Sequence, residues 1–230
     1  MHTQFQIISG AATRNLTVNM STLVVAGWAG RDRAAIEHHI EELAAIGVPR
    51  PSNVPLYYRI ASNQLTQAET VQVVGPDSSG EIETFVFSAD GDLYVGIASD
   101  HTDRKLESHS VALSKQVCAK PVGRSAWLYA DVEAHWDELL VRSWIEENGE
   151  RVLYQEGPLS SLRTPRDLIE GYLVGSGHSR LPDGTGMTCG TVGAIGGIRP
   201  STVFEMELHD PKRQLSLTHR YAVEVLPEVA

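Results

Sequence analysis

The 230-residue chain is 42% hydrophobic and 21% charged, with a formal net charge of −10 at pH 7. A chain of this length buries a sizeable core without staples, so we expect one compact domain, or one with a small N-terminal subdomain. The acidic balance argues against a nucleic-acid partner, because no basic stripe exists to neutralise phosphates. The two cysteines, Cys118 and Cys189, lack metal-ligand spacing and indicate no disulfide framework.

The sequence predicts no membrane partner. Residues 1–10 contain neither a basic n-region nor a continuous apolar h-region, so no leader is expected. No apolar run approaches the ~20 residues that a membrane span requires. We therefore expect a soluble, cytoplasmic protein.

The N-terminal part predicts strands followed by one amphipathic helix. Residues 4–9 and 15–26 are expected to be strands, and glycines after the second interrupt it. The clearest helix covers residues 32–46, where Ile36 and Ile40 belong to one apolar stripe. A glycine and two prolines end this helix, and an ordered loop with short strands follows.

A group of carboxylates is predicted where two central strands meet. Glu81 and Glu83 are two apart in an alternating apolar stretch, so a strand sends both to one face. A second apolar run, residues 93–98, leads to Asp100 and can deliver a third carboxylate. Two carboxylates ~4 Å apart repel by roughly 4 kcal/mol at an effective dielectric near 20. Three converging carboxylates therefore need protons or a hard cation such as magnesium, manganese or calcium. The alternative for the Glu-x-Glu pair is a solvated outer face of a strand.

The C-terminal half predicts mainly strands. A segment of helical or mixed character covers residues 137–147, and a helix is expected over residues 165–174 with Thr164 as its N-cap and Pro165 at its first position. A glycine-dense segment spans residues 184–197. The predicted strands are residues 124–132, 150–156, 203–208 and 216–225. Many short strands with few helices favour a β-rich α+β fold.

The order of these motifs resembles the fumarylacetoacetate hydrolase superfamily, and more narrowly a prokaryotic branch of it. Its members carry a Glu-x-Glu strand, an Asn-Asp-x-Ser/Thr-x-Arg-Asp segment, a Lys before Pro-x-Gly, and a Gly-Thr-Pro near the C-terminus. The counterparts here are Glu81 and Glu83, the segment 99–105, Lys115 before Pro121-Val122-Gly123, and Cys189-Gly190-Thr191-Val192. The resemblance covers about residues 75–227, and more faintly the region before them.

The resemblance implies a mixed β-sandwich roll that is usually a homodimer. Residues 1–74 would form the N-terminal strands and a lid-like helix region, and residues 75–230 the catalytic domain. One continuous domain is the alternative.

The resemblance also implies a set of site residues. Glu81, Glu83 and Asp100 would bind Mg²⁺, with Mn²⁺ or Ca²⁺ as alternatives. Lys115 would stand beside the ion, although its distance from the Pro-x-Gly is one residue shorter than usual, which makes Lys120 a rival. The remaining candidates for substrate contact are Arg104, which would also hold its loop, Gly190 and the hydroxyl of Thr191. The superfamily's proline after this threonine is Val192 here.

The predicted N-terminal helix carries two His-Glu pairs. His38 with Glu41, and His39 with Glu42, have i,i+3 spacing and can meet on one face. The resemblance implies that such a pair on a lid helix moves a proton or activates water. The usual Asn-Tyr-x-x-His lead-in is absent, and the alternative is the polar face of an amphipathic helix.

Three other types of site are not supported. No second His or Cys stands at ligand spacing from His101, which argues against zinc. The glycines of residues 184–197 do not lie in a βαβ unit, which argues against a dinucleotide loop. No Gly-x-Ser-x-Gly occurs, so covalent catalysis by serine is not indicated.

The implied function is a divalent-metal-dependent hydrolase or lyase. It would cleave a C–C bond in a small 2-oxo acid or β-dicarbonyl compound through a metal-stabilised enolate. A decarboxylase, tautomerase or hydratase acting at the same site stays open, as does a non-catalytic relative that binds small molecules.

Overall fold

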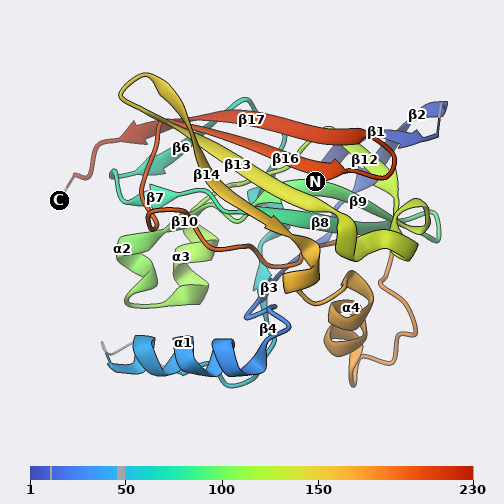
Figure 1. The fold of residues 1–230 in the computed structure, drawn as a ribbon, viewed down its shortest axis with the longest axis horizontal. Coiled ribbons are helices and arrows are strands. Elements are labelled where there is room, and N and C mark those ends of the chain that lie inside the picture. The colour runs from blue at the N-terminus through green and yellow to red at the C-terminus, as the bar shows by residue number, and fades with distance from the viewer. Residues whose placement is uncertain (11, 46–49, 230) are drawn as a thin grey trace.

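Two β-sheets pack face to face and carry the helices at one end, as the computed structural model shows (Figure 1). The structure describes residues 1–10, 12–45 and 50–229; the side chains of Ala35, His39, Glu42, Leu43 and Ala45 lie outside this description. Within the described ranges, no helix has the length and apolar character needed to cross a membrane.

The larger sheet has eight strands of mixed direction. β8 and β9 form an antiparallel hairpin at its centre, while β15 runs parallel to β3 and antiparallel to β8. The strand order is β2 (Ala12–Asn19), β1 (His2–Ser9), β12 (Ser125–Leu128), β9 (Asp92–Ser99), β8 (Ile82–Ala89), β15 (Thr185–Thr188), β3 (Thr22–Gly27) and β4 (Leu56–Ile60). Strands from residues 1–60 thus share one sheet with the central strands, and the division at residue 74 stays a prediction.

The second sheet has five strands. Their order is β14 (Glu150–Pro158), β13 (Leu140–Glu147), β16 (Val203–Asp210), β17 (Leu215–Leu226) and β6 (Thr70–Val74). Two short ladders complete the strands: β7 (Ser78–Ser79) with β10 (Thr102–Asp103), and β5 (Leu65–Thr66) with β11 (Lys120–Pro121).

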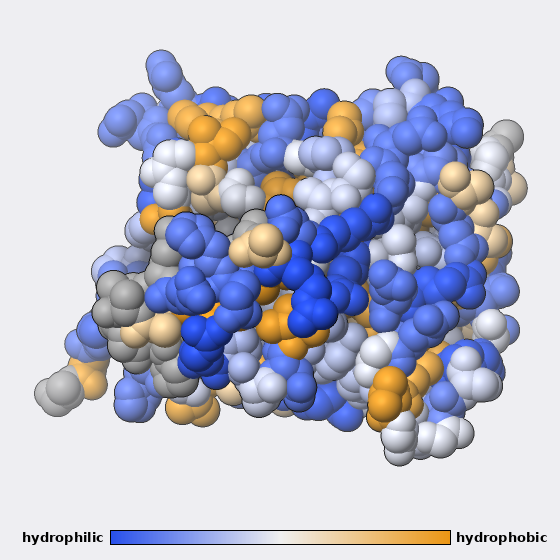
Figure 2. Space-filling view, turned by 60° about the horizontal axis from the view of Figure 1, so that its bottom comes forward, coloured by the Kyte–Doolittle hydropathy of each residue, from blue (hydrophilic) through white to orange (hydrophobic). Residues whose placement is uncertain are grey.

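The helices gather below the sheets in Figure 1. The α-helices are α1 (Arg33–Ala45), α2 (Arg104–Glu107), α3 (Val111–Val117) and α4 (Pro165–Leu173). The 3₁₀ helices are η1 (Ser62–Gln64), η2 (Tyr129–Asp131), η3 (Glu133–Glu138) and η4 (Leu159–Ser161). Figure 2 shows that the face with α1 and α4 is mainly hydrophilic, with small, separate hydrophobic spots.

Both faces of β8 are buried, and they contribute to different cores. Ile82 and Val86 belong to the core between the two sheets, whereas Phe85 and Phe87 belong to a second core on the other face of the larger sheet. Because side chains alternate along a strand, Glu83 points to the same side as the two phenylalanines. A carboxylate therefore continues a row of aromatic rings.

The predicted fold class, α+β and rich in β-structure, is confirmed. The helix predicted over residues 165–174 is α4, and the Thr164 hydroxyl caps it by accepting from the amide of Asp167 at 3.2 Å. The helix predicted over residues 32–46 is α1; its last predicted residue, 46, lies outside the described residues.

Three predicted elements differ from the structure. The strand predicted over residues 124–132 ends at Leu128, and residues 129–131 form the 3₁₀ helix η2. Residues 15–26 form parts of two strands, because β2 turns back on β1 whereas β3 pairs with β15 and β4. The helical or mixed segment at residues 137–147 is mostly strand β13, whose alternate residues Val141, Ser143 and Ile145 are buried against the other sheet. Over so short a segment, apolar residues at every second position are hard to distinguish from the spacing of an amphipathic helix.

Gly186 in β15 offers a stability test. A Cβ at this position would lie 2.3 Å from the ring of Phe85, which is fully buried and cannot move away. We expect Gly186→Ala to lower the free energy of unfolding by about 1–3 kcal/mol through overpacking, as measured by urea denaturation. Gly193→Ala is the matched control, because no atom lies within 4 Å of its Cβ; its effect should stay within about 0.5 kcal/mol. Equal effects in the two variants would contradict this account.

Candidate metal centre

Three carboxylates converge where β8 begins and β9 ends. Ligand oxygens of Glu81, Glu83 and Asp100 lie within 4.8 Å of one another. The antiparallel register, with Ile82 opposite Ser99, brings these strand ends together, and the amide of Asp100 donates to the Glu81 carbonyl at 3.0 Å. Glu83 is 3% exposed and Asp100 1%. The structure thus excludes a solvated outer face for this Glu-x-Glu pair.

Two lysines neutralise Asp100. The ammonium of Lys115, on α3, contacts one carboxylate oxygen, and that of Lys120, on β11, lies 3.1 Å from the other. Burial alone would raise the pKa of Asp100, but the two ammonium groups outweigh it and hold the pKa below its usual value. Lys115 and Lys120 are therefore not rivals for one position, because both contact the same carboxylate.

The two lysines respond differently to burial. Burial lowers the pKa of both, but Asp100 and Glu81 together raise that of Lys115 above its usual value. The pKa of Lys120 is lowered, because its side chain is completely buried and Lys115 adds repulsion. Lys120 also donates to the carbonyl of His101, which fixes the chain just after Asp100.

Arg104, the first residue of α2, holds Glu81 and its own loop. Its guanidinium forms an ion pair with Glu81 at 3.1 Å and donates to Ser79 at 2.7 Å and to Glu107 at 2.8 Å. Burial raises the pKa of Glu81, while Arg104 and Lys115 oppose that shift. The loop-holding role expected for Arg104 matches these contacts, and its contact with substrate stays a prediction.

Glu83 has amide rather than cation partners. The backbone N–H of Gly190 donates to its carboxylate at 2.8 Å, and among the described residues no lysine or arginine forms an ion pair with it. Burial raises the pKa of Glu83 to about 8, and the charge on Asp100 adds to the shift, with Lys115 opposing it. Without a cation, this carboxyl holds a proton at neutral pH.

This donor set suits a hard divalent ion. It offers only carboxylate oxygens, which favour Mg²⁺, Mn²⁺ or Ca²⁺ over softer metals. The proton on Glu83 marks a position where positive charge is needed and where an ion could replace it. Glu81, Glu83 and Asp100 would be the ligands.

His101 is a structural residue beside this centre. One ring nitrogen lies 2.9 Å from the Tyr221 hydroxyl and the other 3.0 Å from that of Ser78. Burial, with Lys120 and Arg104 nearby, lowers the pKa of His101 to about 3, so the ring is neutral. Because both nitrogens have partners, the argument against His101 as a zinc ligand holds.

The turn at Gly190 and Thr191 reaches the centre from the other side of β8. Gly190 has a φ of +86°, and a Cβ there would lie 2.6 Å from that of Ala29, so the position requires glycine. The Thr191 hydroxyl donates to the Ile82 carbonyl at 2.6 Å. In this arrangement the hydroxyl faces the protein, and its contact with substrate stays a prediction.

The helix α1 carries the predicted His-Glu pairs. His38 and Glu41 are exposed on it, and the side chains of His39 and Glu42 lie outside the described residues. Figure 1 shows α1 at the edge of the molecule, below α2 and α3. A catalytic role for either pair stays a prediction.

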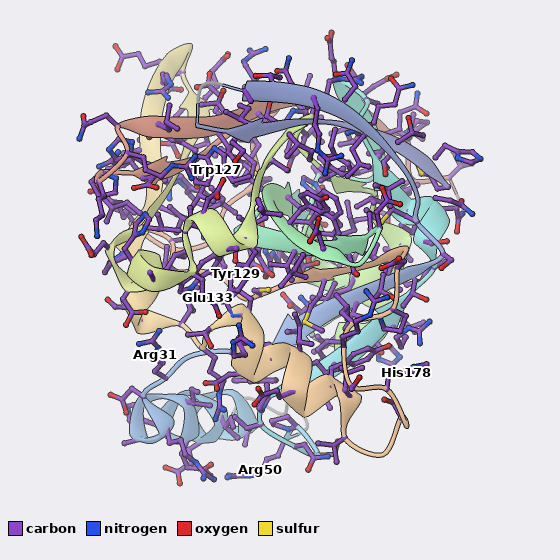
Figure 3. All side chains as sticks on the ribbon, turned by 90° about the vertical axis from the view of Figure 1, so that its right-hand side faces the viewer. Arg31, Arg50, Trp127, Tyr129, Glu133 and His178 are labelled. Atoms are coloured by element: carbon purple, nitrogen blue, oxygen red, sulfur yellow. The ribbon has the colours of Figure 1, made fainter. Side chains whose placement is uncertain are left out.

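A cavity of about 520 Å³ lies elsewhere, against α4. Its lining includes Tyr129, Glu133 and His178, and it includes none of the three carboxylates. In Figure 3, Tyr129 and Glu133 lie above α4, and His178 lies beyond the far end of this helix. Size alone favours this cavity as a ligand site. The buried charges of the carboxylate cluster are the stronger sign of chemistry.

Comparisons with known proteins agree with the fold. A sequence model of the family described as "Protein of unknown function (DUF2848)" matches residues 26–221. No curated protein matches the sequence. Among solved structures, that titled "2-keto-3-deoxy-D-arabinonate dehydratase apo form" is similar with a TM-score of 0.65 and 16% identity, over 96% of this chain and 83% of that chain.

Two further structures give similar values. The same dehydratase "complexed with magnesium and 2,5-dioxopentanoate" has a TM-score of 0.63 and 16% identity, over 96% of this chain and 79% of that chain. The structure titled "Crystal structures of Cg1458" has a TM-score of 0.61 and 15% identity, over 96% of this chain and 86% of that chain. These similarities confirm the predicted fold of the fumarylacetoacetate hydrolase type.

The raised pKa of Glu83 predicts how divalent-ion affinity depends on pH. Below about pH 8 an ion must displace the proton on this carboxyl, so Mn²⁺ affinity should rise with pH and level off above it. With about one proton released per ion, the gain between about pH 6 and about pH 8 is up to about 100-fold. Calorimetry in buffers of different ionisation enthalpy counts the protons. Affinity that does not change over this range would contradict a protonated Glu83.

Proposed function

The chain belongs to the family whose sequence model matches residues 26–221, and we propose that it is a divalent-metal-dependent enzyme acting on a small 2-oxo acid or β-dicarbonyl compound. One observation carries this proposal: three carboxylates, of which Glu83 and Asp100 are buried and Glu81 is partly buried, converge in a fold similar to that of a dehydratase solved with magnesium and 2,5-dioxopentanoate. That compound is itself a 2-oxo acid, whose keto and carboxylate oxygens are suited to a hard cation.

Glu81, Glu83 and Asp100 would hold the ion, with Mg²⁺ first and Mn²⁺ or Ca²⁺ as alternatives. When bound, the ion supplies Lewis-acid stabilisation of negative charge that develops on a substrate oxygen. The protein's own part is to keep Asp100 ionised through its two lysines and to fix Glu83 through the Gly190 amide.

Lys115 is the best-placed side chain for a substrate anion. It is 6% exposed, whereas Lys120 is completely buried, and its ammonium also lies 5.9 Å from the centre of the Tyr58 ring. An ammonium has three N–H groups, so Lys115 can contact Asp100 and still offer a donor to a carboxylate. Substrate contacts by Arg104, Gly190 and Thr191, and an orienting role for Lys120, belong to the same proposal.

Among the reaction types, lyase chemistry that adds or removes water from a 2-oxo acid is favoured over hydrolytic C–C cleavage. The similar solved structure is named a dehydratase, which supports this choice. Hydrolytic cleavage needs a base that activates water, and the proposed candidates His38 and Glu41 are exposed on α1. Decarboxylation and tautomerisation need only a proton donor and would suit the same site.

Metal binding is the first test. We expect calorimetry in metal-stripped buffer to detect Mg²⁺ or Mn²⁺ binding to the wild type, and Glu83→Gln to abolish it, because a neutral amide cannot replace the anionic ligand. Glu146→Gln is the matched control, since this glutamate is exposed on β13 and its loss should leave affinity unchanged. If the wild type binds neither ion, either alone or with oxalate present as a chelating substrate analogue, the metal-dependent proposal is wrong.

Turnover is the second test. A panel of 2-oxo acids and β-dicarbonyl compounds should include at least one substrate whose conversion requires the divalent ion and stops with a chelator. Lys115→Met should lower kcat/KM by at least about tenfold, the effect of about 1.4 kcal/mol of lost transition-state stabilisation. Ligand binding without turnover across the panel would favour the alternative, a non-catalytic relative that binds small molecules.

We also propose that the protein is a homodimer, as the superfamily resemblance implies. Size-exclusion chromatography with light scattering measures the mass of the assembly directly. A mass equal to the 25.1 kDa of one chain would overturn this assignment.

A further inference from the structure

Gln155 on β14 reaches across the sheet interface to the metal-binding strand. Its side-chain oxygen accepts a hydrogen bond from the backbone N–H of Ile82 at 3.0 Å and another from the Ser143 hydroxyl at 2.9 Å. Ile82 stands between two of the three carboxylates, Glu81 and Glu83. The amide of Gln155 therefore fixes the backbone that carries both of them.

The other end of the same amide holds the turn at residues 190–192. Its nitrogen donates to the Thr191 hydroxyl oxygen at 2.8 Å and to the Val192 carbonyl at 2.7 Å. Because the Thr191 proton goes to the Ile82 carbonyl, its oxygen is left to accept. Two donors thus face the oxygen of Gln155 and two acceptors face its nitrogen, which fixes the orientation of the amide.

The turn at residues 190–192 also bonds to Glu83. The Gly190 N–H, one residue before Thr191, donates to the Glu83 carboxylate at 2.8 Å. Gln155 therefore acts on Glu83 by two routes: through the backbone at Ile82, and through the turn that holds the carboxylate. Among the described residues outside β8 and this turn, no other side chain has a hydrogen bond to both.

A β-bulge explains how a glutamine on this strand faces the interior. In the pairing of β13 with β14, Ser143 is opposite Gln155 and Trp144 is opposite Leu153, so Tyr154 is an extra residue. A bulge can re-aim a side chain, and here the consecutive residues Tyr154 and Gln155 are both only 1% exposed. A regular strand would have turned one of them to the outer face.

We propose that Gln155 is a positioning residue of the metal centre. It sets the distance between Glu83 and the other carboxylates without touching the ion or the substrate. This inference rests on the proposed function, in which the three carboxylates bind a divalent ion. Outer partners that orient metal ligands typically change metal affinity by about 10–100-fold.

Gln155→Glu is the sharpest variant, because it keeps the shape and removes both N–H donors. Its second oxygen would face two acceptors: the Val192 carbonyl, and the Thr191 oxygen, whose proton is donated to the Ile82 carbonyl. We expect Mn²⁺ affinity to fall about 10–100-fold, by calorimetry well below the unfolding temperature. The electron paramagnetic resonance spectrum of any bound Mn²⁺ should also change, because it reports ligand geometry.

Ser143→Ala is the matched control. It removes one buried hydrogen bond to the same Gln155 oxygen but leaves the bonds to Ile82 and to the turn. Both variants should lose stability, whereas only Gln155→Glu should change Mn²⁺ affinity and its spectrum. Gln155→Met, which is neutral and of similar length, replaces Gln155→Glu if that variant does not fold.

The outcomes separate this inference from the proposed function. A wild type that binds no divalent ion overturns the proposed function. A wild type that binds Mn²⁺, with Gln155 variants that match its affinity and spectrum, overturns the positioning role and leaves the proposed function intact. An equal loss in Ser143→Ala would also overturn it, because the effect would then follow general destabilisation.

Discussion

Mutual repulsion among three converging carboxylates, two of them buried and one partly buried, is the constraint around which this site is arranged. At an effective dielectric near 20, two such charges ~4 Å apart repel by roughly 4 kcal/mol. The protein offsets this repulsion separately at each group: two lysines at Asp100, an arginine at Glu81, and a backbone amide with a retained proton at Glu83. Glu83 therefore marks where a divalent ion would replace a proton.

The fold supplies these groups from segments far apart in the chain. The β8–β9 hairpin provides the carboxylates, α3 and β11 provide the lysines, and the turn after β15 provides the amide. The five-stranded sheet contributes Gln155, whose amide joins β8 to that turn. Polar contacts at the end of the sheet interface thus tie the two sheets together where the chemistry is expected.

Sequence patterns predicted the three carboxylates, because strand alternation and the order of the motifs can be recognised from the sequence alone. They did not identify Gln155, because the sequence around a glutamine on an edge strand does not show whether its side chain faces solvent or is turned inward by a bulge. Spacing alone makes Lys120 a rival of Lys115, because it does not show that both lysines contact Asp100. Residues 137–147 were misassigned because their helical and strand patterns compete over a short segment.

The sequence by itself determined the β-rich class, the N-cap of α4, and the face that Glu81 and Glu83 share. These follow from side-chain periodicity and local hydrogen bonding, which act over a few residues. Only the tertiary structure decided which cation meets which carboxylate, and that the Thr191 hydroxyl bonds to Ile82. The Thr191 contact joins residues 109 positions apart, and Lys120 lies 20 positions from Asp100, so neither contact follows from a local pattern. The packing of the whole fold brings these residues together.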